Sequence, residues 1–354
     1  MFRTILICSL LVLGLQAVAF TCPKNKITIN DGTTGSLPKG ANGVVKFDKG
    51  TSCTFTFTIP KGFAIRMEST AYYEVSPGDF VKFDDFFLGS DVSQMEYSKD
   101  LQWAVGPELN VSFLSVTGNL NFFAQYTYVD LTKYTQVMMK TGDYFNTTLE
   151  PNKYYTVEAT AGDLVTWNLA MRDTGFYDHS TFELMMFDGP DIVNSEYIGR
   201  LTDYRRSFDF RSDSNHLTFL NLYGSPSNSF VLANDYSKVK AFPQYNVWVV
   251  DPVKDTTGNM YNVQYGKTDA YYTFICDTCD HFFINSLYFN NQSDANGYME
   301  VQVMAPTQNL PVVLNYTNTQ SHKPRANLPQ RIPAKMGTFH IHKADVQFVF
   351  KADL

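Results

Sequence analysis

The chain has 354 residues, of which 44% are hydrophobic, 15% aromatic and 18% charged. This composition excludes a disordered chain, which would be rich in charge and poor in aromatic residues. The formal net charge of −7 argues against nucleic acid as a partner, because phosphate contacts require a basic excess.

The first residues have the pattern of a secretory signal peptide. Arg3 precedes a short apolar run, and Ala17-Val18-Ala19 offers a cleavage site of the A-x-A type. The run is too short to cross a bilayer, which takes about 20 residues, and no later segment is apolar for long enough. We therefore predict a signal peptide at 1–19, no transmembrane segment, and a secreted, extracellular mature chain.

Apolar residues recur with a period of two, which predicts half-buried antiparallel strands. At 54–59 the Phe and Ile side chains share one face and the threonines share the other. The same alternation occurs at 165–171, 299–303 and 346–350. Two other segments, 182–187 and 247–250, are apolar on both faces, which is typical of central strands.

Turn signals separate these strands at intervals of about ten residues, which predicts an all-β fold built of antiparallel β-sandwiches. The proline-rich stretch 321–337 predicts an exposed loop. After the signal peptide the patterns divide the chain at 20–131, 132–241 and 242–354. The first two blocks each have an acidic and aromatic strand that ends in glycine, at Gly89 and Gly189, which suggests a tandem duplication. The third block is β-rich and is a candidate third sandwich.

Four cysteines remain after Cys8 leaves with the signal peptide. An even number in an oxidising compartment predicts disulfides, and closeness in the sequence favours Cys22–Cys53 and Cys276–Cys279. The second pair forms a C-x-x-C motif. A redox pair would need a helix N-terminus, and a zinc site would need further Cys or His ligands. The strand-like flanks favour a static disulfide, with redox and metal roles as the alternatives.

Four N-x-[ST] sequons predict a glycoprotein. Their asparagines are Asn110, Asn146, Asn291 and Asn315.

Several segments resemble a CUB domain. Cys22 just after the signal peptide, with a strand that begins at Cys53, is similar to the opening of that domain. Tyr177-Asp178 followed by 182–189 looks like the CUB "YD … DG" strand, and 225–232 looks like a late CUB strand. The chain looks most like the nematode CUB-like family of secreted proteins, which are associated with responses to pathogens and stress. The resemblance implies tandem CUB-like jelly-roll sandwiches at 20–131 and 132–241.

Some CUB domains bind calcium through a Glu, the Asp of the Tyr-Asp pair and a later loop Asp, since a hard cation needs several converging oxygens. The second block offers Asp178 at the Tyr-Asp position, but it has no Cys and no later loop Asp. The first block offers Glu74, Asp79 and Asp85 at a spacing that differs from the family pattern. The resemblance therefore gives calcium as a candidate cofactor of these four residues, with solvated acidic loops as the alternative.

No catalytic signature is present. The chain lacks H-E-x-x-H and G-x-S-x-G, so we predict that it is not an enzyme. His340 and His342 alternate with apolar residues and so share one strand face, where paired His can bind a metal or simply form a polar surface.

Together these features predict a secreted, non-catalytic binding protein of innate immune defence. Its partner would be a glycan or protein ligand, including microbial surfaces, bound through loops at the sandwich ends. The alternatives are an extracellular matrix or structural protein and, in third place, a secreted enzyme.

Overall fold

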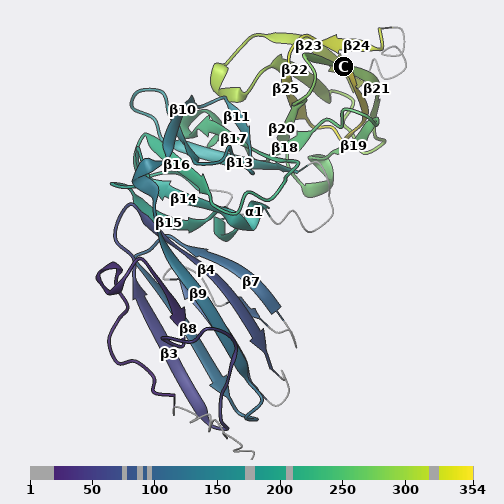
Figure 1. The fold of residues 1–354 in the computed structure, drawn as a ribbon. Helices are drawn as coiled ribbons and strands as arrows, with labels where there is room; N and C mark the ends of the chain where they lie inside the picture. Colours follow the sequence, from purple (N-terminus) through teal and green to yellow (C-terminus); the bar gives the residue numbers. More distant parts are fainter. Residues whose placement is uncertain are drawn as a thin grey trace, which may run out of the picture.

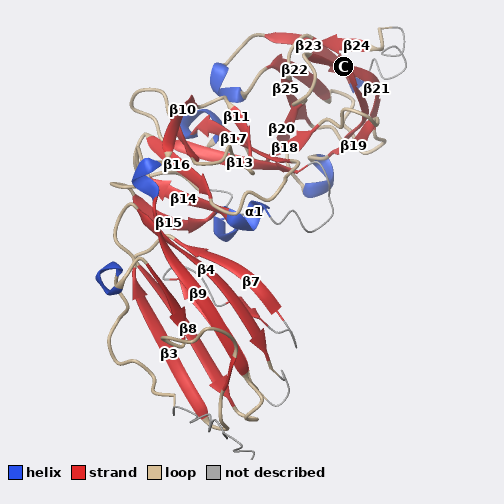
Figure 2. Ribbon diagram, in the orientation of Figure 1, coloured by secondary structure: helices blue, strands red, loops and turns tan. Residues whose placement is uncertain are grey.

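The computed structural model describes residues 20–73, 78–85, 91–93, 98–171, 180–204, 210–318 and 327–353. The predicted signal peptide lies outside these residues. Strands dominate the described part, which confirms the all-β sandwich prediction (Figure 2). No helix there is long and apolar enough to span a bilayer. The short helices are α1 (Ser180–Glu183), α2 (Tyr236–Val239), η1 (Ile29–Asp31), η2 (Leu131–Lys133), η3 (Leu201–Tyr204), η4 (Val263–Tyr265) and η5 (Pro306–Gln308).

The first sandwich has two antiparallel sheets. One sheet contains β3 (Thr51–Thr58), β8 (Glu108–Ser115), β5 (Phe80–Asp85) and β6 (Asp91–Ser93), in that order. The other contains β1 (Thr34–Leu37), β9 (Asn121–Asp130), β4 (Phe63–Tyr72) and β7 (Ser98–Ala104), with β2 (Val45–Lys46) also paired to β9. Phe55 and Phe57 point into the shared core, as the alternation at 54–59 predicts, and meet Met67 and Phe122 from the facing sheet.

The second sandwich begins at β10. Its first sheet contains β10 (Thr135–Lys140), β12 (Lys153–Glu158), β16 (His216–Asn221), β14 (Leu184–Asp188) and β15 (Glu196–Arg200). The facing strands are β11 (Tyr144–Asn146), β17 (Ser229–Asp235) and β13 (Val165–Met171). Trp167, Leu184, Phe219 and Val231 fill the space between the two sheets.

One strand prediction in this sandwich is wrong at its start. We expected a strand over 182–187, but α1 runs to Glu183 and β14 begins at Leu184. Two side-chain contacts hold this helical turn in place: Ser180 Oγ lies 2.7 Å from Thr147 Oγ1, and Ser225 Oγ donates to Glu183 Oε1 at 2.6 Å. Such local polar contacts compete with strand pairing, and an apolar pattern does not reveal them.

The sheet of β11, β17 and β13 continues into a third sandwich. Its further strands are β18 (Tyr245–Val249), β20 (Asp269–Ile275), β25 (Met336–His342), β22 (Tyr298–Val303) and β23 (Val312–Thr317), which makes eight strands in all. The opposing sheet contains β19 (Thr256–Met260), β26 (Val346–Asp353), β21 (His281–Phe289) and β24 (Gln330–Ile332). Figure 1 shows the eight-stranded sheet joining the middle and upper parts of the molecule.

Two details of the second and third sandwiches depart from expectation. The pairs β10–β12, β13–β18 and β18–β20 are parallel, although we expected antiparallel sheets throughout. The predicted loop 321–337 is also partly wrong, because β24 and the start of β25 fall within it. Ile332 and Met336 are buried there, and Pro329 and Pro333 flank β24, which is an edge strand and therefore tolerates proline.

The first and second sandwiches meet through an apolar cluster of their own. Ala64, Trp103 and Leu131 of the first pack with residues that include Met185 and Leu220 of the second. The predicted domain boundaries at 131 and 241 stay predictions, but one sheet and one apolar cluster cross the second of them.

Candidate functional site

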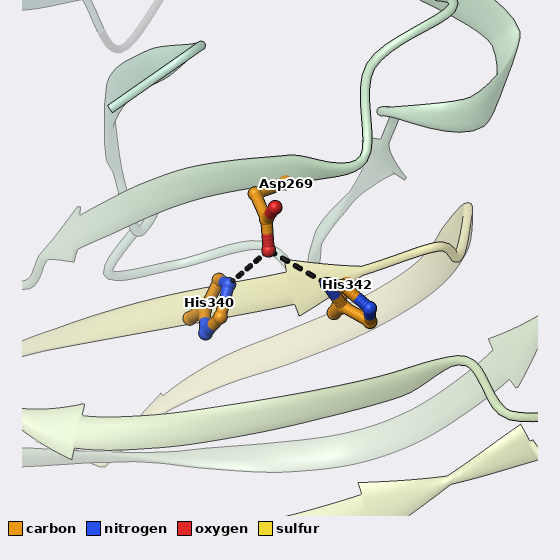
Figure 3. A group of neighbouring side chains, drawn as sticks. All are labelled: Asp269, His340 and His342. Carbon is orange, nitrogen blue, oxygen red and sulfur yellow. Dashed lines mark hydrogen bonds and ion pairs between the residues drawn. The ribbon is translucent and has the colours of Figure 1, made fainter. Parts of the chain in front are cut away.

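Among the described residues, one group has the side-chain types and spacing of metal ligands: Asp269, His340 and His342. The Oδ1 atom of Asp269 lies 2.8 Å from His340 Nε2 and 2.8 Å from His342 Nδ1 (Figure 3). Asp269 is the first residue of β20, and strand pairing places it directly opposite His342 on β25. His340 follows two residues away on the same face, so the sheet itself brings the three side chains together.

Aromatic rings pack against both histidines. Tyr271 stacks on His340 with ring centroids 4.4 Å apart, and Phe242 stacks on Tyr271 at 3.6 Å. Tyr298 of β22 stacks on His342 at 4.9 Å. We name the surface formed by Asp269, Tyr271, Tyr298, Glu300, His340 and His342 the histidine face.

A second carboxylate completes the histidine face. Glu300 Oε2 lies 3.7 Å from His340 Nδ1, the ring nitrogen that points away from Asp269. The side chains of His340, His342, Asp269 and Glu300 are 20%, 27%, 29% and 31% exposed. Solvent or a ligand can therefore reach all four, although each is partly shielded.

The electrostatics of this face favour an ionised Asp269. Burial alone would raise the pKa of its carboxyl, but the hydrogen bonds from His342 and His340 act in the opposite direction and leave the pKa below its ordinary value of 3.8. Burial, aided by nearby carboxylates, raises the pKa of the Tyr271 and Tyr298 hydroxyls. At neutral pH the face therefore presents a carboxylate between neutral phenol rings.

The sequence predicted only part of this group. That His340 and His342 share one strand face is confirmed. Asp269 was missed because it lies 71 residues before His340, and only the pairing of β20 with β25 unites them. A carboxylate at the start of a strand carries no signal about which strand will lie beside it.

Of the four predicted calcium ligands the structure describes two, Asp79 and Asp85, and calcium binding by the set stays a prediction. Glu74 and Asp178 lie outside the described residues. Asp79 and Asp85 lie just before and at the end of β5, and a rise of about 3.3 Å per residue separates them by about 20 Å. These two carboxylates cannot share one ion.

Asp79 and Asp85 each have protein partners instead. Asp79 is buried and accepts hydrogen bonds from Val116 N at 2.6 Å, Thr117 N at 2.9 Å and Thr117 Oγ1 at 2.5 Å. Asp85 Oδ2 lies 3.7 Å from the guanidinium of Arg200, which belongs to the second sandwich. Asp79 thus fixes a turn, and Asp85 forms part of the contact between the two sandwiches.

The predicted glycosylation sites differ in their surroundings. Asn291 and Asn315 are exposed, and Asn110 lies half-buried on the outer face of β8. The Nδ2 atom of Asn146, where a glycan would be attached, donates to Ser227 O at 2.8 Å. Glycan attachment at these four positions stays a prediction.

Both predicted disulfides are present. Cys22 pairs with Cys53 and Cys276 pairs with Cys279. The second pair lies in the turn between strands β20 and β21, as the flanking patterns predict, and both of its cysteines are buried. Strand β21 rather than a helix follows the motif, so the motif lacks the helix dipole that activates a redox cysteine.

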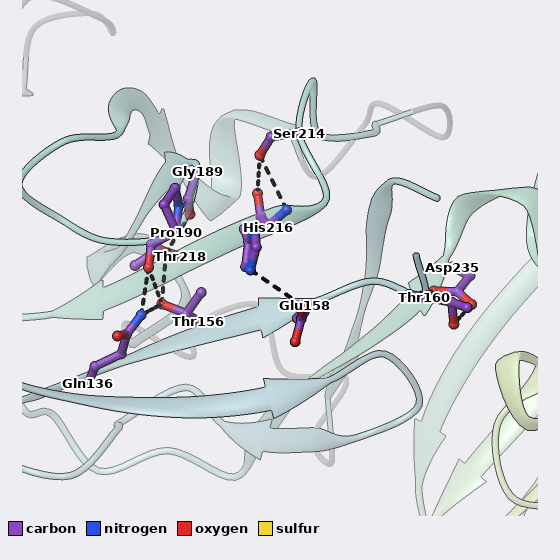
Figure 4. A network of polar contacts seen from close by, with 10 residues as sticks. All are labelled: Gln136, Thr156, Glu158, Thr160, Gly189, Pro190, Ser214, His216, Thr218 and Asp235. Carbon is purple, nitrogen blue, oxygen red and sulfur yellow. Dashed lines mark hydrogen bonds and ion pairs between the residues drawn. The ribbon is translucent and has the colours of Figure 1, made fainter. Parts of the chain in front are cut away.

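A second polar cluster, in the second sandwich, is satisfied by its own members (Figure 4). Gln136 Nε2 donates to Thr156 Oγ1 at 2.9 Å and to Pro190 O at 2.5 Å, while Thr218 Oγ1 donates to Gly189 O at 2.8 Å. Thr156 and Thr218 are fully buried. These hydrogen bonds hold the turn after β14 against the sheet, so the cluster stabilises the fold.

A comparison with family models gives one match: residues 17–132 fit the model described as the CUB-like domain. The first sandwich and the Cys22–Cys53 disulfide lie within this range. Residues 17–132 are similar in sequence to CUB-like domains. The CUB-like domain therefore accounts for the first sandwich, and the part of the chain that carries the histidine face lies beyond it.

Comparison with solved structures returns, among other proteins, CUB-containing fragments of two MASP proteins and the extracellular region of a zebrafish protein. The CUB1-EGF-CUB2 domain of human MASP-1/3 is 12% identical, covering 58% of this chain and 100% of that chain with a TM-score of 0.22. The corresponding rat MASP-1 domains give 12% identity, coverage of 59% and 99%, and a TM-score of 0.24. The extracellular region of zebrafish Gpr126/Adgrg6 gives 12% identity, coverage of 94% and 53%, and a TM-score of 0.25. No curated protein matches the sequence.

Proposed function

We propose that this chain is a secreted, non-catalytic binding protein that recognises an extracellular glycan or protein ligand. The CUB-like domain at 17–132 carries this proposal, because CUB-like domains are generally non-catalytic binding modules of extracellular proteins. Two disulfides support an oxidising compartment. The resemblance to nematode CUB-like proteins supports a role in innate defence, with microbial surface glycans as the first ligands to test.

We assign the ligand contact to the histidine face. We first expected the ligand to contact loops at the sandwich ends, and segments 74–77, 86–90 and 94–97 of the first sandwich region lie outside the described residues. The histidine face combines partly exposed aromatic rings, which offer flat apolar surface, with carboxylates that accept hydrogen bonds from hydroxyl groups. It is also built on central strands of an eight-stranded sheet, which hold these groups in fixed positions.

A binding experiment with matched tyrosine variants tests the assignment. The full secreted glycoprotein is applied to a glycan array and to bacterial cells, together with Tyr298→Ala and Tyr288→Ala. Tyr298 belongs to the histidine face, whereas Tyr288 is 49% exposed on β21 in the opposing sheet. We expect Tyr298→Ala to weaken binding about tenfold, equivalent to about 1.4 kcal/mol, and Tyr288→Ala to leave it unchanged.

Two outcomes would contradict this proposal. Equal losses in both variants would remove the assignment to the histidine face. Absence of binding by the unaltered protein to every glycan and cell surface would remove the glycan ligand, and a pull-down with extracellular protein fractions would then test the protein ligand.

A further inference from the structure

We propose that Asp269, His340 and His342 bind one divalent transition-metal ion, with Zn²⁺ as the first candidate. One ligand atom from each residue lies within 4.8 Å of the other two, from two strands that are directly paired. Two imidazoles and one carboxylate are a common donor set for zinc sites that keep an open coordination position. Metal binding here does not depend on the glycan or protein ligand proposed above.

The donor atoms select the class of metal. Two nitrogens and one carboxylate oxygen suit Zn²⁺ and Cu²⁺, which accept imidazole readily. Calcium needs six to eight oxygens, and magnesium prefers oxygen ligands in an octahedral arrangement. The histidine face offers only the carboxylates of Asp269 and Glu300 near the imidazoles, so neither hard cation fits the site.

The ligands are already oriented toward one point. Tyr271 and Tyr298 stack on the two imidazole rings and restrict their rotation. Glu300 Oε2 faces the second nitrogen of His340 at 3.7 Å. A carboxylate in this position typically fixes the ring of a metal-bound histidine and makes it a stronger ligand.

Asp269 must move to admit the ion. Zinc bonds of about 2.0–2.1 Å at tetrahedral angles place neighbouring ligand atoms about 3.3 Å apart. Asp269 Oδ1 is 2.8 Å from each nitrogen, so it would withdraw by about half an ångström from both. Asp269 is partly exposed at the start of its strand, where a side-chain rotation supplies this movement.

The site also has room for a further ligand. Three protein ligands leave one tetrahedral position open, and the partial exposure of all three residues directs that position toward solvent. Further along the same strands the pairs Thr273–Thr338 and Ile275–Met336 are buried, so the face is open only at the histidine end.

Zinc titration of the full-length chain tests this assignment. Chelator-treated protein is titrated with ZnCl₂ by calorimetry, and its melting temperature is followed with and without the ion. Binding to the folded state alone raises the melting temperature by mass action. We expect one Zn²⁺ per chain, and we expect a large excess of CaCl₂ not to displace it.

Four variants distinguish residues that bind the ion from a histidine that does not. His342→Ala and Asp269→Asn should lose most of the affinity, and Glu300→Gln should lose about tenfold. His281→Ala is the control, because His281 also pairs with a carboxylate, Asp353, but lies in the opposing sheet. Its affinity should equal that of the unaltered chain. Co²⁺ in place of zinc should give the visible absorption of a tetrahedral site, and His342→Ala should abolish it.

Two results would contradict the zinc site. If the unaltered chain binds no Zn²⁺ with 1:1 stoichiometry, or if His342→Ala and Asp269→Asn bind as tightly as His281→Ala, the three residues are only a hydrogen-bonded bridge. Asp269→Asn keeps the shape of the side chain, so it stays informative if His342→Ala does not fold.

Discussion

Asp79 illustrates how a carboxylate in an acidic loop can act inside the fold. Its two oxygens accept three hydrogen bonds from Val116 and Thr117, and this joins the segment before β5 to the turn after β8. Sequence alone marks it only as one acidic residue among several. Its burial and its partners make it a structural acceptor.

Replacement of Asp79 by Ala should lower the free energy of unfolding by about 2–3 kcal/mol, because buried donors lose a charged acceptor. Asp84→Ala is the matched control on β5, since Asp84 is 39% exposed and pairs with the surface Lys82. We expect a change of at most about 1 kcal/mol there. Urea denaturation measures both, and equal losses would refute the structural role of Asp79.

Tyr128 should make the first sandwich sensitive to alkali. Its hydroxyl donates to Ile27 O and Thr58 O, both at 3.1 Å, and burial raises its pKa to about 12. Because the folded pKa exceeds the unfolded value of about 10, the stabilisation is complete below pH 10 and is lost as the pH rises toward 12. The urea concentration at the midpoint of unfolding should fall between pH 10 and 12, and this fall should be smaller in Tyr128→Phe than in the unaltered chain. Tyr288→Phe, at an exposed position, should leave that fall as it is.

At the scale of elements, the alternation of apolar residues locates strands but not their neighbours. The strands expected at 54–59, 299–303 and 346–350 are present, because each buries one face in a sandwich. The parallel pairing of β10 with β12 could not be predicted, since β11 between them joins the opposite sheet. For the same reason the sequence could not predict that Asp269 of β20 lies beside the two histidines of β25.

The two disulfides constrain elements to very different degrees. Cys22–Cys53 closes a loop of 31 residues and ties the N-terminal segment to β3, whereas Cys276–Cys279 spans only a turn. Chain entropy predicts that a Cys22→Ala/Cys53→Ala variant loses about 3–4 kcal/mol and that a Cys276→Ala/Cys279→Ala variant loses about 2 kcal/mol. Guanidinium denaturation under non-reducing conditions measures the difference. A larger loss at the short loop would contradict this ranking.

At the scale of the whole molecule, the apolar cluster between the first two sandwiches should make them unfold together. Met185 is fully buried in that cluster, so Met185→Ala should cost about 2–5 kcal/mol and split one calorimetric transition into two. Met138→Ala, at a 52% exposed position on β10, should change stability by at most about 0.5 kcal/mol. A single transition in Met185→Ala would show that Met185 is not required for the two sandwiches to unfold together.

The sheet that β13 and β18 share bears on how such a chain can be assembled in evolution. A segment that moves between genes is best cut where no sheet is divided, because a divided sheet leaves open backbone edges. A cut in the chain between β17 and β18 would divide the eight-stranded sheet and expose the backbone edges of β13 and β18. It would also separate Phe230 and Leu232 from Val247. The CUB-like domain, in contrast, keeps both of its sheets within its own segment. We therefore expect relatives to gain or lose that domain as a unit near residue 132 and to inherit the remainder undivided.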